Sequence, residues 1–122
     1  MLTVLHFVAD ALWILAMALI ASTSRGARKR IPAEARMPMQ WGVDRKPTWR
    51  ARRDPALGWM SGLPLVLGLF LSAASQLTVQ TAQEAVLMFL IRTLTAGLFA
   101  IVHVTWLRAS LRTLEDEGVV TP

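Results

Sequence analysis

The sequence predicts an all-α integral membrane bundle of three transmembrane helices, with a long basic loop between helices one and two. The first observation behind this prediction is composition: hydrophobic residues make up 54% of the 122 residues and charged residues 17%, with a mean hydropathy of +0.45. This balance is too apolar for an ordinary soluble domain of this size. The second observation is that apolar residues form three long stretches, and the third is that most basic residues lie between the first two. The length fits a single membrane domain, 1–122.

The first predicted span covers residues 2–22, where about 20 mostly apolar positions follow one another. At about 1.5 Å per residue, such a helix crosses a hydrocarbon core of about 30 Å. A signal peptide is the competing interpretation. It requires a basic segment before a shorter apolar core, and residues 2–22 show neither, so a retained transmembrane helix is favoured.

The second and third spans are predicted over residues 57–79 and 85–107. A short polar turn joins them, so they are expected to form a helical hairpin. Pro64 lies about two turns into the second span, where it removes one backbone donor and is expected to kink the helix. The third helix is expected to continue as a helical tail over residues 108–118, because Gly118 is a typical C-terminal stop.

The basic loop, residues 23–56, predicts the orientation of the chain. It holds ten of the 13 Lys and Arg residues. The positive-inside rule therefore places the loop and the C-terminus in the cytoplasm and the N-terminus outside, in a bacterial inner membrane. Because the basicity belongs to one loop, topology explains it and no nucleic-acid partner is expected. Four basic residues after the first span are expected to contact anionic lipid headgroups of the bilayer: Arg25, Arg28, Lys29 and Arg30.

Two ionisable residues of opposite charge lie inside the predicted spans. Asp10 is eight residues from the outer end of the first span, and Arg92 is eight residues beyond Glu84, near the start of the third. The two spans run in the same direction, so both side chains are expected about 12 Å deep from the same side. A charge within a span costs about 2.5–3.5 kcal/mol on insertion scales and needs a partner. We therefore predict an ion pair between Asp10 and Arg92.

A polar cluster is expected around this ion pair. His6 shares a helical face with Asp10, and the second span carries a stripe of small and polar residues that reaches the same depth. Gly58 and Gly62 in that span have the small-xxx-small spacing that predicts a close helix approach. The stripe comprises Ser61, Gly68, Ser72, Ser75 and Gln76, and the predicted polar cluster comprises His6, Asp10, Ser72, Ser75, Gln76 and Arg92.

Three roles fit the polar cluster. It is a buried pair that fixes helix register, a proton or ion relay through His6, Asp10 and Arg92, or a docking site for a partner subunit. The sequence shows no Ser/His/Asp constellation, carboxylate pair or glycine-rich phosphate loop, so no enzyme activity and no catalytic residue are expected. His6 and Asp10 lack a third ligand, so no metal site is predicted.

The two intramembrane histidines raise the question of haem. His6 is expected about 6 Å and His103 about 28 Å from the outer end, so the two cannot hold the same iron. Ligation of haem b by His103 would need a histidine from a partner subunit at matching depth. No cofactor is therefore expected in this chain alone, and a hydrogen-bonded histidine within the bundle is the favoured interpretation.

One part of the basic loop is expected to be ordered. Prolines restrict its backbone, and two tryptophans flank a Gly42-Val43-Asp44 turn. Trp41, Trp49 and Trp59 are expected at the membrane interface as an aromatic belt. The residues of this loop motif are Pro38, Gln40, Trp41, Gly42, Asp44, Pro47 and Trp49.

The loop motif, with a second apolar helix that opens at Leu63-Pro64, resembles a small membrane domain of unknown function. That domain is found at the N-terminus of the SDP-toxin immunity proteins of bacteria, and the resemblance covers residues of about 5–75. Gln40 stands where that family usually has histidine, and Arg45 or Lys46 where it has the turn glycine. The matching positions are Pro38, Trp41, Gly42, Asp44, Pro47 and Thr48.

The resemblance implies an integral membrane protein of the immunity or signal-sensing kind, without catalysis. Members with basic N-termini would place the loop outside the cell. The local charges of this chain place it inside, and we follow the charges because they act directly on insertion.

The functional hypothesis is a small bacterial inner-membrane protein that acts by binding, of immunity, sensing or accessory type, with another membrane protein as its expected partner. One alternative is a structural subunit of a larger respiratory or photosynthetic membrane complex. A second alternative is a haem- or quinone-binding membrane anchor that uses His103.

Overall fold

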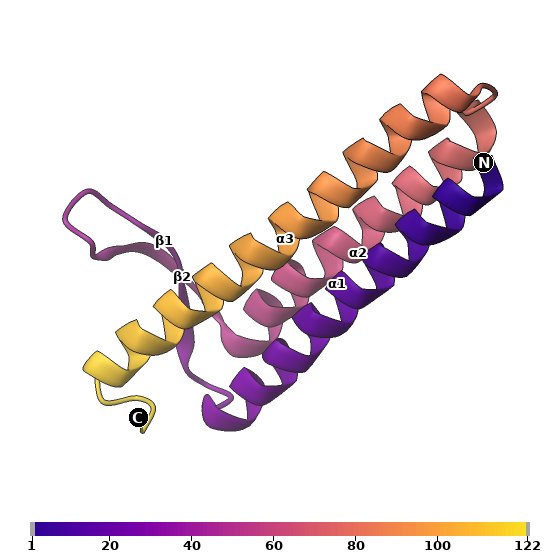
Figure 1. The fold of residues 1–122 in the computed structure, drawn as a ribbon. Helices are drawn as coiled ribbons and strands as arrows, with labels where there is room; N and C mark the ends of the chain where they lie inside the picture. The colour runs from indigo at the N-terminus through magenta and orange to yellow at the C-terminus, as the bar shows by residue number, and fades with distance from the viewer. Residues whose placement is uncertain (1, 122) are drawn as a thin grey trace.

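Three long helices run side by side and form a slender bundle with one β-hairpin at one end (Figure 1). The computed structural model describes residues 2–121. The helices are α1 (Leu2–Arg30), α2 (Arg53–Thr78) and α3 (Ala82–Asp116), and each is long and apolar enough to cross a membrane. The predicted all-α fold with three candidate spans is therefore confirmed, and it is the fold of a multi-pass membrane protein.

The helices extend beyond the predicted spans. α1 continues eight residues past the predicted end at residue 22, and α2 begins four residues before the predicted start at residue 57. At the start of α3, Thr81 Oγ1 accepts a hydrogen bond from the Glu84 backbone N–H at 3.1 Å and donates one to its carboxylate at 3.0 Å. These two hydrogen bonds cap the start of α3 and fix the turn between α2 and α3. α3 ends at Asp116, and Gly118 adopts φ +75° as a C-terminal stop.

The segment predicted as a continuous loop, 23–56, contains regular structure that the sequence analysis did not predict. Its middle forms an antiparallel hairpin of β1 (Arg36–Trp41) and β2 (Pro47–Arg52). Met37 pairs with Ala51 and Gln40 with Trp49, with register irregularities on both sides of Gln40. The strands escaped prediction because proline is unfavourable inside a strand. Here it is tolerated, because a two-stranded sheet consists only of edge strands.

The turn of the hairpin lies where the Gly42-Val43-Asp44 segment predicted one. Gly42 N–H donates to the Lys46 carbonyl at 2.9 Å, and Asp44 Oδ1 accepts from the Lys46 N–H at 3.1 Å. Arg45 adopts φ 62°, a left-handed conformation that glycine favours.

A compact apolar core lies where the hairpin covers the ends of the helices. Met37 has no exposed surface, and Trp106 and Leu114 of α3 are 6% and 1% exposed. Trp106 Nε1 and Ser110 Oγ both donate to the Pro38 carbonyl, at 3.1 and 3.2 Å, so polar contacts also attach β1 to α3. The buried core residues are Ala27, Ile31, Met37, Ala56, Leu57, Trp106, Leu107, Leu114 and Val120.

The close helix approach occurs at a different glycine from the predicted pair. A Cβ at Gly58 or Gly62 would meet nothing within 4 Å, so the prediction that these two residues permit close packing is wrong. A Cβ at Gly68 would collide with the indole of Trp13. The large α1 side chain, rather than a second glycine, fills the space over Gly68. Spacing alone cannot show which glycine faces a neighbouring helix.

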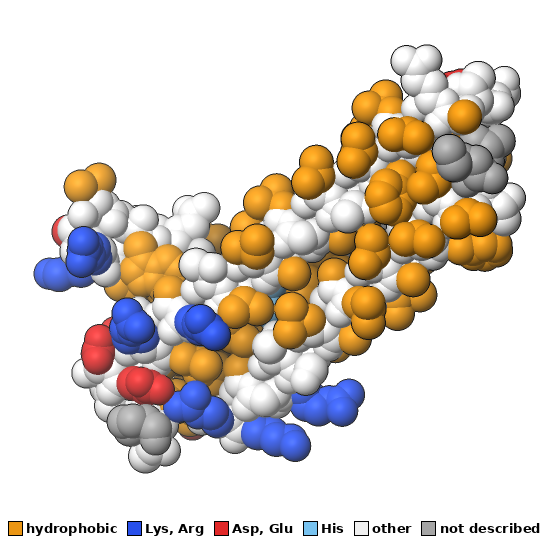
Figure 2. Space-filling view, viewed as in Figure 1, with side chains coloured by type: hydrophobic (Ala, Val, Ile, Leu, Met, Phe, Trp, Pro, Cys, Tyr) orange, Lys and Arg blue, Asp and Glu red, His pale blue; other side chains and the backbone are white. Residues whose placement is uncertain are grey.

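The surface separates into an apolar shaft and a charged end. Figure 2 shows hydrophobic side chains along the length of the bundle and Lys and Arg side chains around the end that carries the hairpin. Large exposed apolar residues occur on all three helices, for example Leu15, Leu69 and Leu94 at 66%, 66% and 71% exposure. Such a surface suits hydrocarbon as the solvent.

Candidate functional site

The predicted ion pair is present in the half of the bundle that contains the N-terminus. Arg92 Nη2 donates to Asp10 Oδ1, and Ser72 Oγ donates to the same oxygen at 3.0 Å. The Arg92 side chain is 1% exposed, whereas the Asp10 side chain is 31% exposed. Helices α1, α2 and α3 therefore meet at one carboxylate, which remains partly open on one side.

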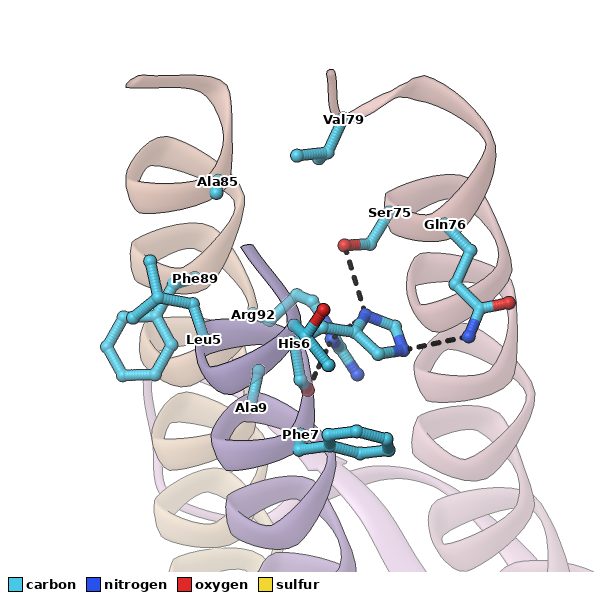
Figure 3. Close-up of a pocket in the computed structure, with 11 residues that line it drawn as sticks. Leu5, His6, Phe7, Ala9, Ser75, Gln76, Val79, Ala85, Phe89 and Arg92 are labelled. Carbon is cyan, nitrogen blue, oxygen red and sulfur yellow. Dashed lines mark hydrogen bonds between the residues drawn. The ribbon is translucent and has the colours of Figure 1, made fainter. Parts of the chain in front are cut away.

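His6 links the ion pair to α2, as Figure 3 shows. Its Nδ1 lies 3.3 Å from Arg92 Nη1 and 3.4 Å from Ser75 Oγ, and its Nε2 lies 3.3 Å from Asp10 Oδ2. Because a guanidinium can only donate, Nδ1 must accept from Arg92.

All six residues of the predicted polar cluster are brought together. Gln76 Nε2 lies 3.2 Å from His6 Nε2, which completes the contacts between α1 and α2. Every residue of the stripe on α2 contacts α1. Ser61 hydrogen-bonds to Ser24, and Gly68 lies against Trp13. Ser72 hydrogen-bonds to Asp10, and Ser75 and Gln76 contact His6. The helical phase of the sequence thus predicted the correct inward face of α2.

Two cavities adjoin the polar cluster. The end cavity, of about 250 Å³, opens at the end of the bundle near the α2–α3 turn, and His6, Ser75, Gln76 and Arg92 supply its polar wall (Figure 3). The lateral cavity, of about 320 Å³, lies between α1 and α2 on the other side of the ion pair, and Asp10, Ser72 and Arg92 supply its polar groups. Arg92 lines both cavities. The cluster is therefore accessible from two directions.

His103 belongs to a second polar group, nearer the hairpin. Its ring is 1% exposed, its Nε2 lies 3.0 Å from Ser24 Oγ, and Ser24 in turn lies 2.9 Å from Ser61 Oγ. The Trp106 ring packs against it with centroids 5.8 Å apart. An iron ligand at Nε2 would have to displace Ser24 from a buried position. Ser24 was missed by the sequence analysis, because it lies beyond the predicted end of the first span.

The residues of the loop motif do not form one site. Pro38 is buried and its carbonyl binds α3, and Trp41 Nε1 donates to Thr113 Oγ1 at 3.3 Å. Trp49 is 49% exposed. Gly42 and Asp44 shape the turn, and Gln40 and Pro47 lie in the strands on either side of it. Most of the motif therefore holds the hairpin in shape and attaches it to α3.

A bidentate ion pair that the sequence did not reveal joins the hairpin to the end of α3. Arg50 Nη1 and Nη2 donate to the two carboxylate oxygens of Glu117 at 2.9 and 2.5 Å. These hydrogen bonds hold the pKa of Glu117 below its ordinary value and raise the pKa of Arg50. The partners are 67 residues apart, so no local spacing signals the contact.

The basic cluster after the first span is divided between two roles. Arg28 pairs with Asp54 at 3.3 Å and Arg30 with Glu115 at 2.9 Å, so these two side chains bind within the protein. Arg25 and Lys29 are exposed and take part in no salt bridge within residues 2–121. Contact with lipid headgroups stays a prediction, for which Arg25 and Lys29 are the more available residues.

No protein-family model, curated protein or solved structure matches the chain. Within the part of the chain that the structure describes, no group of three or more His, Cys, Asp or Glu side chains could hold a metal ion.

Proposed function

We propose that the protein acts by binding, as a small bacterial inner-membrane protein of the immunity or sensing kind, and that the end cavity receives its ligand. The observation that carries this proposal is a polar cavity of about 250 Å³ directly beside the buried guanidinium of Arg92. A pair that only fixes helix register needs no such space, because an empty cavity forfeits packing contacts.

The lining of the end cavity favours a ligand with both apolar and hydrogen-bonding groups. Phe7, Val79 and Phe89 supply apolar walls, and His6 and Gln76 supply polar groups. A few polar groups within an apolar lining are typical of ligand sites. In the orientation predicted by the positive-inside rule, this cavity faces the outside of the cell, where an incoming ligand would reach it first.

The resemblance to the membrane domain of SDP-toxin immunity proteins supports the choice of an immunity or sensing role. That resemblance includes residues of about 5–75, and the α1 and α2 residues of the end cavity lie within this range or at its edge. The proposal therefore names an SDP-type toxin as the first ligand to test.

The test uses bacteria that are sensitive to an SDP-type toxin and that express the chain. Wild-type protein is expected to raise survival at a fixed toxin dose. Gln76→Ala is expected to reduce that protection, because it removes a polar group from the cavity wall and the contact of Gln76 with His6. The matched control is Leu77→Ala, which alters a neighbouring side chain that is 80% exposed and lines neither cavity.

Survival is measured together with the amount of each variant in the membrane fraction, so that loss of protein is not mistaken for loss of binding. If cells with and without the wild-type chain die at the same dose, the immunity proposal is wrong. If Gln76→Ala protects as well as Leu77→Ala at equal protein levels, the ligand does not use the end cavity.

A further inference from the structure

We propose that the lateral cavity is a second binding site, which takes a membrane-dissolved molecule with a neutral hydroxyl head and an apolar tail. The cavity lies between α1 and α2, and the side chains along its length are Ile14, Met17, Leu65 and Leu69. Its volume of about 320 Å³ falls at the lower end of the range of ligand pockets, which is about 300–1,000 Å³. This inference does not depend on the proposed immunity function.

The polar end of the lateral cavity contains an acceptor that the protein leaves partly open. Asp10 lines this cavity, and its side chain is 31% exposed even after it pairs with Arg92, Ser72 and His6. In a hydrocarbon environment, an exposed carboxylate is unfavourable. A hydrogen-bond donor that covers Asp10 from the lateral cavity would relieve this penalty.

The same cavity is lined by two residues that have buried donors without acceptors. Trp13 is 5% exposed and Arg92 1% exposed, and neither Trp13 Nε1 nor Arg92 Nε has a hydrogen-bond partner within residues 2–121. A buried N–H without an acceptor costs about 1–3 kcal/mol. Both nitrogens are closed off from the cavity space, so Asp10 is the polar group that the lining leaves open.

A neutral hydroxyl matches this open carboxylate. It donates one hydrogen bond to Asp10 and adds no charge to the site. A cationic head fits less well, because Arg92 already balances the charge of Asp10 and a further cation would leave a net charge inside the membrane.

Neither a plain hydrocarbon nor water can both fill the apolar length of the cavity and cover its polar end. A lipid tail would fill the apolar length of the cavity and leave Asp10 uncovered. A water molecule would serve the polar groups, but it would not fill the space between Ile14 and Leu69. A long-chain alcohol does both, because its hydroxyl and its tail occupy opposite ends of the same cavity.

The test uses the full chain in lipid nanodiscs and two probes: dodecanol brominated in mid-chain and dodecane brominated at matching positions. Bromine quenches nearby tryptophan emission, so the signal of Trp13 is obtained as the difference between wild type and Trp13→Phe. The alcohol is expected to quench Trp13 at an about tenfold lower membrane mole fraction than the hydrocarbon, as one hydrogen bond to a charged group implies.

Two variants with matched exposure locate the site. Ile14→Phe introduces a larger ring into the lateral cavity and is expected to weaken alcohol quenching several-fold. Leu15→Phe lies next to it on α1, lines neither cavity and should leave quenching unchanged; both native side chains are 66% exposed. Asp10→Asn, where it folds, is expected to reduce the preference for alcohol over hydrocarbon.

Several outcomes would overturn the proposal. Equal quenching by alcohol and hydrocarbon would mean that the cavity holds only lipid tails or water. Equal effects of Ile14→Phe and Leu15→Phe would place the probe elsewhere. Tighter binding of the matching brominated dodecylammonium than of the alcohol would contradict the assignment of a neutral head.

Discussion

The two ends of the bundle are held together in different ways. Near the N-terminus, α1, α2 and α3 meet around a buried ion pair with a cavity on each side. At the hairpin end, apolar side chains around Met37 and Trp106 form a buried core. The two ends are thus held together by different kinds of contact.

This difference follows from the solvent. Within hydrocarbon, burying another leucine gains little, so hydrogen bonds and ion pairs must supply much of the specificity of helix association. At the membrane edge, water makes apolar burial favourable again, and the hairpin can cover a conventional core. Four changes test this contrast.

The largest effect is expected from breaking the ion pair. Asp10→Asn and Arg92→Gln should each destabilise the bundle by about 3–5 kcal/mol, because each leaves a buried charge without its partner. The double variant should recover part of that loss. The measurement is a double-mutant cycle of unfolding free energies in mixed micelles. Additive losses would show that the two charges are not coupled.

The next largest effect is expected in the apolar core. Met37→Ala removes a side chain with no exposed surface and should destabilise the hairpin end by about 2–5 kcal/mol. Tryptophan emission and protease sensitivity of the hairpin report the change. Val43→Ala is the control, since Val43 at the turn is fully exposed. If Met37→Ala leaves the hairpin as protected as the control does, the core does not hold it.

A smaller effect is expected at the closest helix approach. Gly68→Ala places a methyl group against the indole of Trp13 and should cost about 1–3 kcal/mol through overpacking. Gly62→Ala meets open space and should show no loss. Thermal unfolding in detergent compares the two variants. A loss at Gly62 equal to that at Gly68 would mean that helix geometry, and not contact with Trp13, determines the cost.

The smallest effect is expected at the ion pair between Arg50 and Glu117. Because the folded protein holds the pKa of Glu117 below its ordinary value of 4.5, its stabilising contribution is present above that pH and is lost as the pH falls through the folded pKa. The side chains are 29% and 39% exposed, so the contribution should be below about 1 kcal/mol. Protease cleavage of the hairpin should therefore increase slightly on acidification.

Glu117→Gln supplies the control for this pH effect. At neutral pH, the hairpin of this variant should already be cleaved slightly faster than that of the wild type. Its cleavage rate should change little further on acidification. If wild type and Glu117→Gln respond to pH in parallel, another group is responsible.

Sequence reasoning was most successful where depth and helical phase decide the outcome. Asp10 and Arg92 could be paired from their distances to the helix ends, and the inward face of α2 followed from the spacing of its serines and Gln76. The depth of a residue in the membrane and its position around the helix depend only on regular helix geometry and on where each apolar span begins. Both can be read from the sequence. The roles proposed for the cluster are not decided by the same reasoning.

Sequence reasoning was least successful where contacts between residues far apart in the chain determine the structure. The strands around Pro38 and Pro47 form because α3 offers Trp106 and Ser110 as donors to the Pro38 carbonyl, and nothing local to the loop indicates this. Gly68 rather than Gly58 or Gly62 faces a neighbour because Trp13 of α1 lies opposite it. Such contacts depend on the packing of the whole bundle.

The length of α3 has a mechanical consequence for the hairpin. Its 35 residues extend over about 52 Å, whereas a hydrocarbon core is about 30 Å thick. About 20 Å of rigid rod therefore projects beyond the lipid, and the hairpin is fastened to that part through Ser110, Thr113 and Glu117. If the opposite end of α3 acts as a pivot, tilting by about 10° in a bilayer of different thickness swings the fastened hairpin sideways by about 9 Å. With such a pivot, a change in bilayer thickness changes the position of the hairpin relative to the membrane.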